Sequence, residues 1–446
     1  MIDSEYNLKA EYMKRKITEN ISNWYTNNIT PHLYLTGMRG TGKTTLITEF
    51  FSGQTAQEQL YINFETDYVI RNFFIDYFSG NISSLDQHSE SNKSISGALA
   101  LYFNADAQNF DSSVIIIDEL HTACLGDIPF SAADNEKKSR IIFIDSEGTE
   151  TENLPISFTH IKVYPMMFDE FMDNTGKEWY HEVISGHFER NRSIPELVHN
   201  EINDIFSDYL STGGMPAVIN KYIEHSENNN HIFTPEEYQL KELRNILMGI
   251  QEYESRESHK MLSLLDNIVL QMLSGNRHYI FRQLVKGTSG SYYSDPIRKL
   301  CESGILIRST FGGHNRFYWA DTGMLSAKIK ACYKCDEERF DEIITRNYIA
   351  QHLAALRDNN RNSADNGSGL EYWCSNSLSE VEFILEDNSR KIAIKYIGNS
   401  KKKIRSLQIY DNQYSADEKI AVGDYNFYIM GNVKLIPQYA VFCLNY

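Results

Sequence analysis

Eight consecutive residues, Gly37-Met38-Arg39-Gly40-Thr41-Gly42-Lys43-Thr44, have the spacing G-x-x-x-x-G-K-[ST]. Glycines let a backbone wrap closely around a phosphate, and a following helix adds the positive end of its dipole. In such a loop the lysine reaches the β- and γ-phosphates and the threonine hydroxyl binds Mg²⁺. We therefore expect a nucleotide site whose phosphates are held by Gly37, Met38, Arg39, Gly40, Thr41, Gly42, Lys43, Thr44 and Thr45.

A second group of reactive side chains follows an apolar run at residues 113–117, where Asp118 and Glu119 stand next to each other. In nucleotide-hydrolysing enzymes an acid at such a strand end helps to hold Mg²⁺, which places Asp118 beside Thr44 as the second metal residue. The next acid can orient and deprotonate the attacking water, a role that suits Glu119. Alone, such a pair could simply face solvent, but it follows a complete phosphate loop.

Two further strand ends carry polar residues. Residues 141–144 are apolar and lead into Asp145 and Ser146. On a strand beside the acid-bearing one, we expect Ser146 to sense the γ-phosphate or the attacking water, which makes it a third catalytic candidate with Lys43 and Glu119. A plain turn is the alternative for Ser146. Glu65 ends another apolar run and either faces the site or caps a helix.

An arginine could complete the neutralisation of the phosphates. Arg39 lies within the loop, and Arg140, Arg190 and Arg192 lie further along the chain. The sequence does not choose among them.

The elements that must position these residues alternate. Apolar runs at residues 33–36, 60–64, 114–117, 141–144 and 161–163 predict strands separated by helices. This alternation indicates an α/β layer with a parallel sheet. A leading helix is predicted over residues 6–25 and a mainly helical region over 170–256. Helices followed by a β-hairpin are predicted over 260–319, and β-rich segments follow the polar connection at 357–369.

Composition bounds the class of protein. The 446 residues carry a net charge of −17, which argues against a surface uniformly attracted to nucleic acid or to anionic membranes. There is no apolar run of membrane-spanning length and no signal-peptide core near the start. Six scattered cysteines suit a reducing cytosol, so we expect a cytoplasmic protein. Cys332 and Cys335 have metal-ligand spacing without a second pair, so we interpret them as unrelated thiols rather than a zinc site.

Several short segments, taken in order, resemble a widespread group of bacterial and archaeal AAA-like P-loop ATPases. The segments are the phosphate loop, Tyr61-Ile62-Asn63-Phe64-Glu65, the acid-bearing strand, Tyr164-Pro165-Met166-Met167-Phe168-Asp169-Glu170-Phe171, Tyr209-Leu210-Ser211-Thr212-Gly213-Gly214-Met215-Pro216 and Tyr318-Trp319-Ala320-Asp321-Thr322-Gly323-Met324. The resemblance implies ATP as the nucleotide and Mg²⁺ as its metal. It implies an α/β fold with a P-loop core (1–170), a helical region (171–256), a winged-helix module (257–325) and a restriction-endonuclease-like domain (326–446).

The last of these domains departs from the family pattern. Arg346 stands where the family tends to have a glutamate, Glu382 keeps an acid, Ala393 replaces a second carboxylate, and Lys395 is retained. Metal-dependent cleavage needs carboxylates to hold Mg²⁺, and alanine offers no ligand. We expect an endonuclease-like fold without cleavage activity.

Two surfaces are candidates for a partner. A run without acids contains Arg390, Lys391, Lys395, Lys401, Lys402, Lys403 and Arg405. It either contacts DNA phosphates without reading sequence or is a solvated loop. The presumed recognition helix of the winged-helix module offers Tyr292, Tyr293, Ser294, Arg298 and Lys299, for which we favour a packing role over the major groove.

Three functions remain open. The protein is an ATP-driven switch or motor coupled to its C-terminal half, a nucleotide-stabilised scaffold for nucleic acid or a partner protein, or an ATP-gated nuclease. Ala393 makes the nuclease the weakest of the three, and Glu119 favours hydrolysis over binding alone. Assembly into a homo-oligomer would favour the switch or motor.

Overall fold

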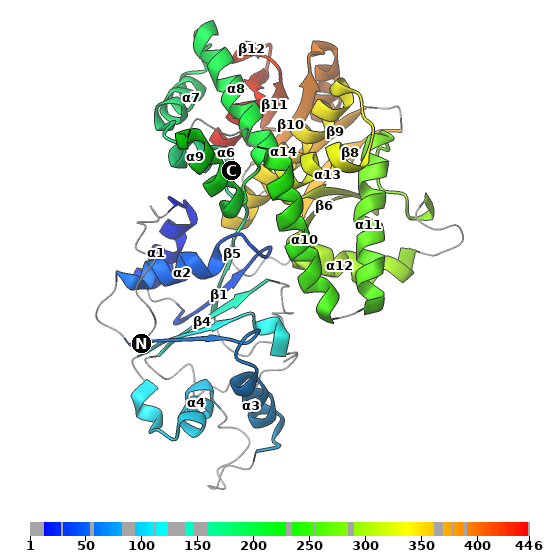
Figure 1. The fold of residues 1–446 in the computed structure, drawn as a ribbon. Helices are drawn as coiled ribbons and strands as arrows, with labels where there is room; N and C mark the ends of the chain where they lie inside the picture. The colour runs from blue at the N-terminus through cyan, green and yellow to red at the C-terminus, as the bar shows by residue number, and fades with distance from the viewer. Residues whose placement is uncertain are drawn as a thin grey trace.

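The structure is a computed structural model (Figure 1). It describes residues 13–27, 30–53, 58–82, 94–110, 113–123, 139–146, 158–228, 234–253, 255–283, 290–360, 369–376, 379–386 and 390–444. The predicted leading helix is shorter than expected in this part of the chain, since α1 spans Ile17–Asn27 and residues 13–16 are not helical. Residues 6–12 of that prediction lie outside the described ranges.

A five-stranded parallel sheet forms the N-terminal region. Its strands are β1 (His32–Thr36), β2 (Gln59–Asn63), β3 (Val114–Asp118), β4 (Arg140–Asp145) and β5 (Phe158–Lys162), in the order β2-β3-β4-β1-β5. All ten residues of β1 and β3 are buried, because central parallel strands are covered on both faces. The predicted α/β fold with a parallel-sheet core is confirmed.

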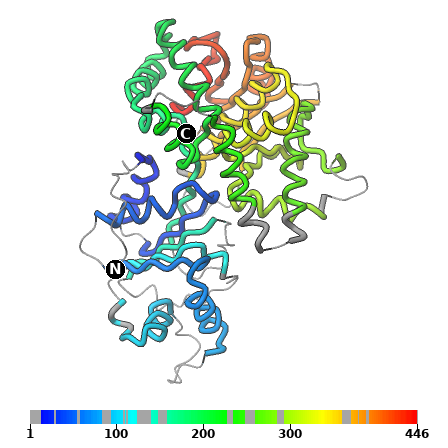
Figure 2. Tube along the Cα trace, viewed as in Figure 1, coloured from blue at the N-terminus to red at the C-terminus, as the bar shows by residue number. Residues whose placement is uncertain are grey.

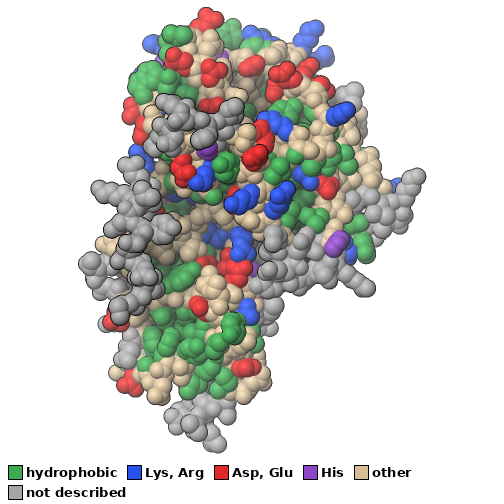
Figure 3. All heavy atoms as spheres, viewed as in Figure 1, with side chains coloured by type: hydrophobic (Ala, Val, Ile, Leu, Met, Phe, Trp, Pro, Cys, Tyr) green, Lys and Arg blue, Asp and Glu red, His purple; other side chains and the backbone are tan. Residues whose placement is uncertain are grey.

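Helices cover this sheet. Buried residues of α1 and of α2 (Lys43–Ser52) pack in one core with β1, β3 and β4, and α3 (Tyr68–Ser79) and α4 (Ile95–Phe103) contribute to a second. On the face in Figure 3, hydrophobic side chains gather over the lower part of the molecule, where Figure 1 places α3 and α4. These two helices carry exposed Tyr68, Val69, Leu101 and Phe103.

The predicted helical region is present after the sheet. It consists of α6 (Phe168–Asn174), α7 (Glu178–Arg190), α8 (Glu196–Thr212), α9 (Pro216–Asn228) and α10 (Pro235–Tyr253). The C-terminal trace lies beside α7–α9 in Figure 2, and Ser193, just after α7, donates a hydrogen bond to the Phe427 carbonyl (3.0 Å). The beginning of this region is therefore joined to the end of the chain.

Helices and a hairpin follow, as expected for residues 260–319. They are α11 (Ser255–Leu273), α12 (Ser294–Glu302), β6 (Leu306–Phe311) and β7 (His314–Trp319). Gly312 and Gly313 form the hairpin turn and both have positive φ, which explains why glycine occupies these positions.

The C-terminal half is organised around a mixed eight-stranded sheet. Its remaining strands are β8 (Leu370–Cys374), β9 (Glu380–Glu386), β10 (Lys391–Gly398), β11 (Glu418–Gly423), β12 (Tyr428–Met430) and β13 (Val433–Pro437). The sheet order is β12-β13-β11-β10-β9-β8-β6-β7. The hairpin joins this sheet through parallel pairing of β6 with β8, so the domain boundary expected at residue 325 is not a break between sheets.

Three more helices accompany this sheet: α13 (Thr322–Cys332), α14 (Glu337–Asn360) and α15 (Arg405–Tyr414). Buried residues of α14 pack in one core with residues of α6, α8 and β9–β11. None of the helices in the described ranges combines the length and the apolar character needed to cross a bilayer.

Candidate functional site

The glycine-rich loop connects the end of β1 to the start of α2. Gly37, Gly40 and Gly42 all have positive φ, at 141°, 85° and 87°. A Cβ on Gly37 would lie 2.1 Å from the Val163 carbonyl oxygen, so only glycine fits between β1 and the segment after β5. The Thr41 hydroxyl donates to the Met38 carbonyl (2.9 Å) and closes the loop on itself.

Lys43, the first residue of α2, is buried and aimed back across the loop. Its Nζ donates to the carbonyls of Gly37 (2.8 Å) and Met38 (3.2 Å) and to Ser146 Oγ at the end of β4 (3.0 Å). Burial lowers the pKa of Lys43, and the carboxylates of Glu119 and Asp118 oppose that shift. The predicted loop lysine and Ser146 therefore meet.

Thr44 and Asp118 lie side by side, as a shared Mg²⁺ site requires. The Thr44 hydroxyl donates to Asp118 Oδ2 (2.7 Å), which also accepts from the Tyr61 hydroxyl (2.8 Å). A hydroxyl and a carboxylate, completed by water and phosphate oxygens, match the oxygen ligands that Mg²⁺ prefers. These two residues fit that ion. Thr45 is exposed in the first turn of α2.

Glu119 is buried and has a left-handed backbone conformation, with φ at 54°. Its Oε1 accepts a hydrogen bond from Ser146 Oγ (3.0 Å), while Oε2 has no hydrogen-bond partner within the described part of the chain. Burial raises the pKa of Glu119, and Lys43, His121 and Ser146 oppose this shift. Oε2 also lies 3.4 Å from His121 Nδ1, and a buried carboxylate oxygen that makes no hydrogen bond can accept a proton from water.

His121, Asp145 and Tyr34 belong to the same site, although sequence reasoning gave them no role. His121 Nδ1 lies 2.8 Å from Asp145 Oδ1 and 3.4 Å from Glu119 Oε2. Asp145 Oδ2 accepts from the Tyr34 hydroxyl (2.9 Å). Glu119, His121 and Asp145 each offer a ligand atom within 4.8 Å of the others, close enough to hold a metal ion. For His121, the only signal in the sequence was its position two residues after Glu119.

The four candidate arginines are not gathered at this site. Arg39 is paired with Glu65 (2.8 Å), which shows Glu65 bound to the loop. Arg140 starts β4, at the opposite end of that strand from Asp145, and its guanidinium lies 4.1 Å from the centre of the Tyr25 ring. Arg190 ends α7 and Arg192 follows it, where Ser193 and the residue after it bond to the C-terminal segment. Of these four arginines, only Arg39 lies at the phosphate loop.

Arg15 also belongs to the site, although no sequence motif indicated it. It lies just before α1, and its guanidinium donates to the carbonyls of Thr41 in the loop (2.8 Å) and of Tyr164 after β5 (2.8 Å). The same group pairs with Glu170 of α6 (3.2 Å). Arg15 therefore ties the phosphate loop to the segment that leads into the helical region.

The loop also packs directly against the later regions. The Met38 side chain is only 2% exposed and belongs to a core shared with α9–α13, so only its backbone remains for a phosphate. A Cβ on Gly40 would meet the Met215 side chain at 2.8 Å, and one on Gly304 would meet the Met38 backbone nitrogen at 3.1 Å. The loop is therefore one wall of the hydrophobic core of the following regions.

Three of the segments used for the resemblance meet beside this core. The Gly214 N–H donates to Asp321 Oδ2 (2.7 Å), and the Gly214 carbonyl accepts from the Met166 N–H (2.7 Å). Asp321 also caps α13, because its Oδ1 accepts from the Met324 N–H (2.8 Å). Burial raises the pKa of Asp321 to about 6.

In the C-terminal sheet, Glu382 is engaged by two cations, Lys395 and Arg346. Both of its oxygens lie 3.3 Å from Lys395 Nζ, and Oε1 lies 3.2 Å from Arg346 Nη2. A carboxylate that already neutralises two cations is a poor ligand for a metal ion. Ala393 is fully buried in the core of the sheet.

The basic run does not form one patch. Lys395 is buried with Glu382, which corrects its assignment to an exposed DNA-binding surface. Arg390 is paired with Glu418, and Lys391 with Glu386 (3.0 Å), before and at the start of β10. The exposed remainder lies beyond the other end of β10 and consists of Lys401, Lys402, Lys403 and Arg405.

The presumed recognition helix is also less available than its sequence indicated. Tyr293 is buried in the core that contains Met38, and Arg298 is paired with Asp295 and Glu302 on its own helix. The exposed Tyr292 ring is covered by Lys260, whose Nζ lies 4.0 Å from its centre.

Residues 30–172 match the family model AAA_14, which is described as an AAA domain. The matched stretch contains all five strands of the parallel sheet and the phosphate loop, Asp118, Glu119 and Ser146 of the candidate site. This region is therefore similar to an AAA-type P-loop ATPase domain. No curated protein matches the chain.

Similar solved structures include the Walker-type ATPase PABY2304 of Pyrococcus abyssi, at 16% identity and a TM-score of 0.45, covering 72% of this chain and 96% of that one. They also include the Aeropyrum pernix ORC2 protein in ADPNP–ADP complexes (14%, TM-score 0.33, 75% and 96%). AMPPCP-bound DnaA from Aquifex aeolicus is a third (14%, TM-score 0.27, 65% and 90%).

Proposed function

We propose that the protein binds ATP with Mg²⁺ and hydrolyses it, and that it passes the resulting change to its C-terminal half as a switch or motor. The observation that carries the proposal is the bridge from Lys43 through Ser146 to Glu119, beside the Thr44–Asp118 pair. Binding alone needs the loop, Lys43, Thr44 and Asp118. The buried Glu119, whose Oε2 makes no hydrogen bond within the described residues, is the feature that binding alone does not need.

The reaction assigns a role to each of these residues. The backbone N–H groups of the loop and Lys43 hold the phosphates, and Thr44 and Asp118 would hold Mg²⁺, which supplies charge neutralisation when bound. Glu119 Oε2 accepts a proton from the attacking water, whose oxygen forms a bond to the γ-phosphorus as the bond to the β–γ bridging oxygen breaks. Ser146 donates a hydrogen bond to Glu119 Oε1 and accepts one from Lys43. The proposed base and the phosphate-binding lysine are therefore held at a fixed distance from each other.

The test is ATP turnover by the full chain, with and without double-stranded DNA. We expect Lys43→Ala to lose binding and turnover, and Glu119→Gln to keep binding but lose about 10²–10⁴-fold in turnover. Lys334→Ala and Glu58→Gln remove exposed charges of the same type and serve as matched controls. Equal turnover in Glu119→Gln and wild type would contradict hydrolysis by this site. Wild-type binding without turnover would instead favour the nucleotide-stabilised scaffold.

For the C-terminal half, we propose an endonuclease-like fold without cleavage activity, over residues 326–446. The support is the engagement of Glu382 by Lys395 and Arg346, together with the buried alanine at position 393. Plasmid nicking with Mg²⁺ or Mn²⁺ that disappears in Glu382→Ala would contradict this proposal.

The partner proposed for the switch is DNA bound without sequence readout through Lys401, Lys402, Lys403 and Arg405. We expect the double variant Lys402→Glu/Lys403→Glu to weaken salt-dependent DNA binding and DNA-stimulated turnover without changing basal turnover. Turnover that does not respond to DNA directs the search toward a protein partner. Size-exclusion chromatography with and without ATP tests whether copies of the chain assemble.

A further inference from the structure

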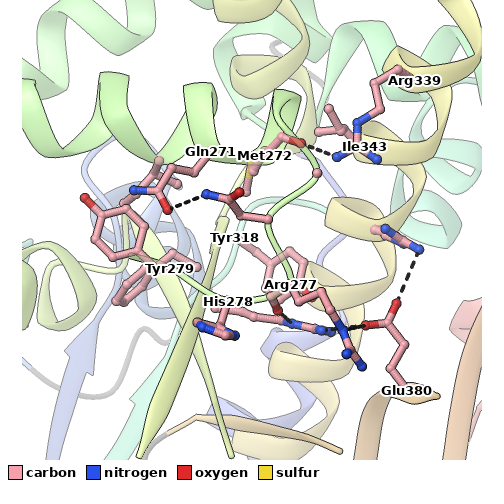
Figure 4. A pocket seen from close by; sticks show the side chains of 15 residues that line it. Gln271, Met272, Arg277, His278, Tyr279, Tyr318, Arg339, Ile343 and Glu380 are labelled. Carbon is pink, nitrogen blue, oxygen red and sulfur yellow. Dashed lines mark hydrogen bonds and ion pairs between the residues drawn. The ribbon is translucent and has the colours of Figure 1, made fainter. Parts of the chain in front are cut away.

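A cavity of about 120 Å³ lies between the end of α11, the β6–β7 hairpin, α14 and the start of β9. Figure 4 shows Gln271 and Met272 from α11, Arg339 and Ile343 from α14, and Glu380 from β9 around it. Arg277, His278 and Tyr279 come from the segment between α11 and α12. We propose that this cavity binds the phosphate group of a phosphomonoester.

The charge of the cavity favours an anion. Four of its lining residues are arginines: Arg277, Arg316, Arg339 and Arg346. With the adjoining Lys395 they face three carboxylates, those of Glu342, Glu380 and Glu382. The surplus of two positive charges contrasts with the net charge of −17 on the whole chain.

The acid inside the cavity stays ionised and aligns the arginines. Although burial acts to raise it, Arg316, Lys395 and Arg346 lower the pKa of Glu380 to about 2. Glu380 Oε2 lies 2.8 Å from Arg316 Nη2 and 3.7 Å from Arg277 Nε. Glu380 therefore holds two guanidinium groups in place and neutralises only part of their charge.

Donors remain available at two of the arginines. Within the described residues the ion pairs of Arg346 all go through Nη2, and its Nε is buried there without a hydrogen-bond partner. Arg277 also lines the cavity; its Nη2 donates to the Ser379 carbonyl (3.1 Å) and its Nε lies 3.7 Å from Glu380, out of the five N–H donors that a guanidinium carries. A buried donor without a partner is costly and indicates an ion or water at the site.

Size and charge select the phosphate class. The volume is close to that of a cavity of about 150 Å³ that holds one benzene molecule, so a phosphate group fits while a whole nucleotide extends outside. A phosphomonoester carries about −1.5 to −2 at neutral pH, which matches the surplus. Guanidinium groups bind such oxygens in pairs. The proposed ligand is either a small phosphomonoester or the 5′-phosphate at an end of a nucleic acid.

This cavity is separate from the nucleotide site, since none of its lining residues belongs to the parallel sheet or the phosphate loop. It adjoins Glu382 through Arg346, the residue that stands at the position of a family acid. We assign phosphate binding alone to this cavity.

The experiment measures binding of inorganic phosphate to the full chain by isothermal titration calorimetry, in wild type, Lys43→Ala and Arg277→Gln. We expect binding to survive Lys43→Ala and to weaken about 10- to 100-fold in Arg277→Gln, since a charge-assisted hydrogen bond is lost. Arg298→Gln, at an exposed arginine of α12, is the matched control and should bind as wild type does. Arg346→Lys keeps the charge but removes the planar fork, and is a second variant expected to weaken binding.

A second arm compares one oligonucleotide with a 5′-phosphate and the same oligonucleotide with a 5′-hydroxyl. Stronger binding of the phosphorylated form, lost in Arg277→Gln, identifies a nucleic-acid end as the source. If only inorganic phosphate and small phosphomonoesters bind, the site belongs to a small molecule. Absence of phosphate binding, or binding lost in Lys43→Ala and retained in Arg277→Gln and Arg346→Lys, overturns the proposal.

Discussion

At the scale of single residues, Ser146 links the two charged groups at the centre of the candidate nucleotide site. Its hydroxyl contacts Lys43 and Glu119 together, two groups of opposite charge that are both removed from water. Burial lowers the pKa of Lys43 and raises the pKa of Glu119. Each group limits the shift of the other.

The first prediction concerns the acid side of the pH–rate profile. Glu119 must be ionised to accept a proton, so turnover falls as the pH drops through its raised pKa, at a higher pH than for an ordinary glutamate. Ser146→Ala removes a hydrogen bond that lowers this pKa, and we expect the acid limb to move to still higher pH. Turnover measured against pH tests this, with Ser52→Ala on the exposed end of α2 as control. An acid limb that stays in place or moves down would show that Glu119 is not the titrating base.

At the scale of elements, the side chain of Asp321 links α13 to α8 and α9. Its two carboxylate oxygens cap α13 and hold the turn between α8 and α9. In this turn, the Gly214 carbonyl accepts a hydrogen bond from the Met166 N–H, which belongs to the segment that leads into α6. Elements that are separate in the sequence are thus fixed by one buried side chain.

The second prediction is a pH dependence of stability that comes from Asp321. Because burial raises its pKa from 3.8 to about 6, the folded protein keeps a proton that the unfolded chain releases. Stability from this group is fully present below pH 4 and is lost as the pH rises to about 6, by about 3 kcal/mol at 1.36 kcal/mol per pKa unit. Urea midpoints of wild type and Asp321→Asn between pH 4 and 7 test this, and we expect the variant to show the flatter curve. Parallel curves would assign the dependence to other groups.

The third prediction concerns Gly214, whose N–H donates a hydrogen bond to Asp321. A Cβ there would lie 2.1 Å from the Met166 carbonyl oxygen, which is backbone and cannot rotate away. We expect Gly214→Ala to lower the free energy of unfolding by about 1–3 kcal/mol through overpacking. Gly53→Ala is the matched control, since a Cβ at Gly53 meets nothing within 4 Å and its φ is −80°. Thermal unfolding should separate the two variants, and equal melting temperatures would show that the turn can open without cost.

At the scale of the whole molecule, the phosphate loop is continuous with the core of the later helices. Met38 contributes to the cluster that also contains Met215 and Leu265, while Arg15 links the loop to α6. A change at the phosphates can therefore reach α9–α13 by direct packing. This continuity supports the proposal of a switch.

The fourth prediction tests this route through Met38. Met38→Ala removes the side chain and leaves the loop backbone, so we expect ATP to bind within about tenfold of wild type, while the cavity costs about 2–5 kcal/mol of stability. ATP-induced protection of α10 and α11 amides from hydrogen exchange should be present in wild type and reduced in Met38→Ala. Met38→Leu conserves volume and should behave as wild type. Unchanged protection in Met38→Ala would exclude this packing as the route.

The sequence by itself determined the phosphate loop, the acid pair and the strands of the parallel sheet. These features are local: glycine conformation, the helix after the loop and the continuous apolar runs are all decided within a few neighbouring residues. The pairing of Thr44 with Asp118 followed because parallel strands end at one edge of a sheet.

Only the tertiary structure decided which distant residues complete the sites. Arg15 and Glu170 are 155 residues apart, and Arg346 and Glu382 are 36 apart, so no periodicity relates them. The basic run looked continuous in the sequence, but strand β10 separates its ends and places Lys395 inside. Burial and charge pairing depend on which elements pack together, and that is fixed by the fold as a whole rather than by any one segment.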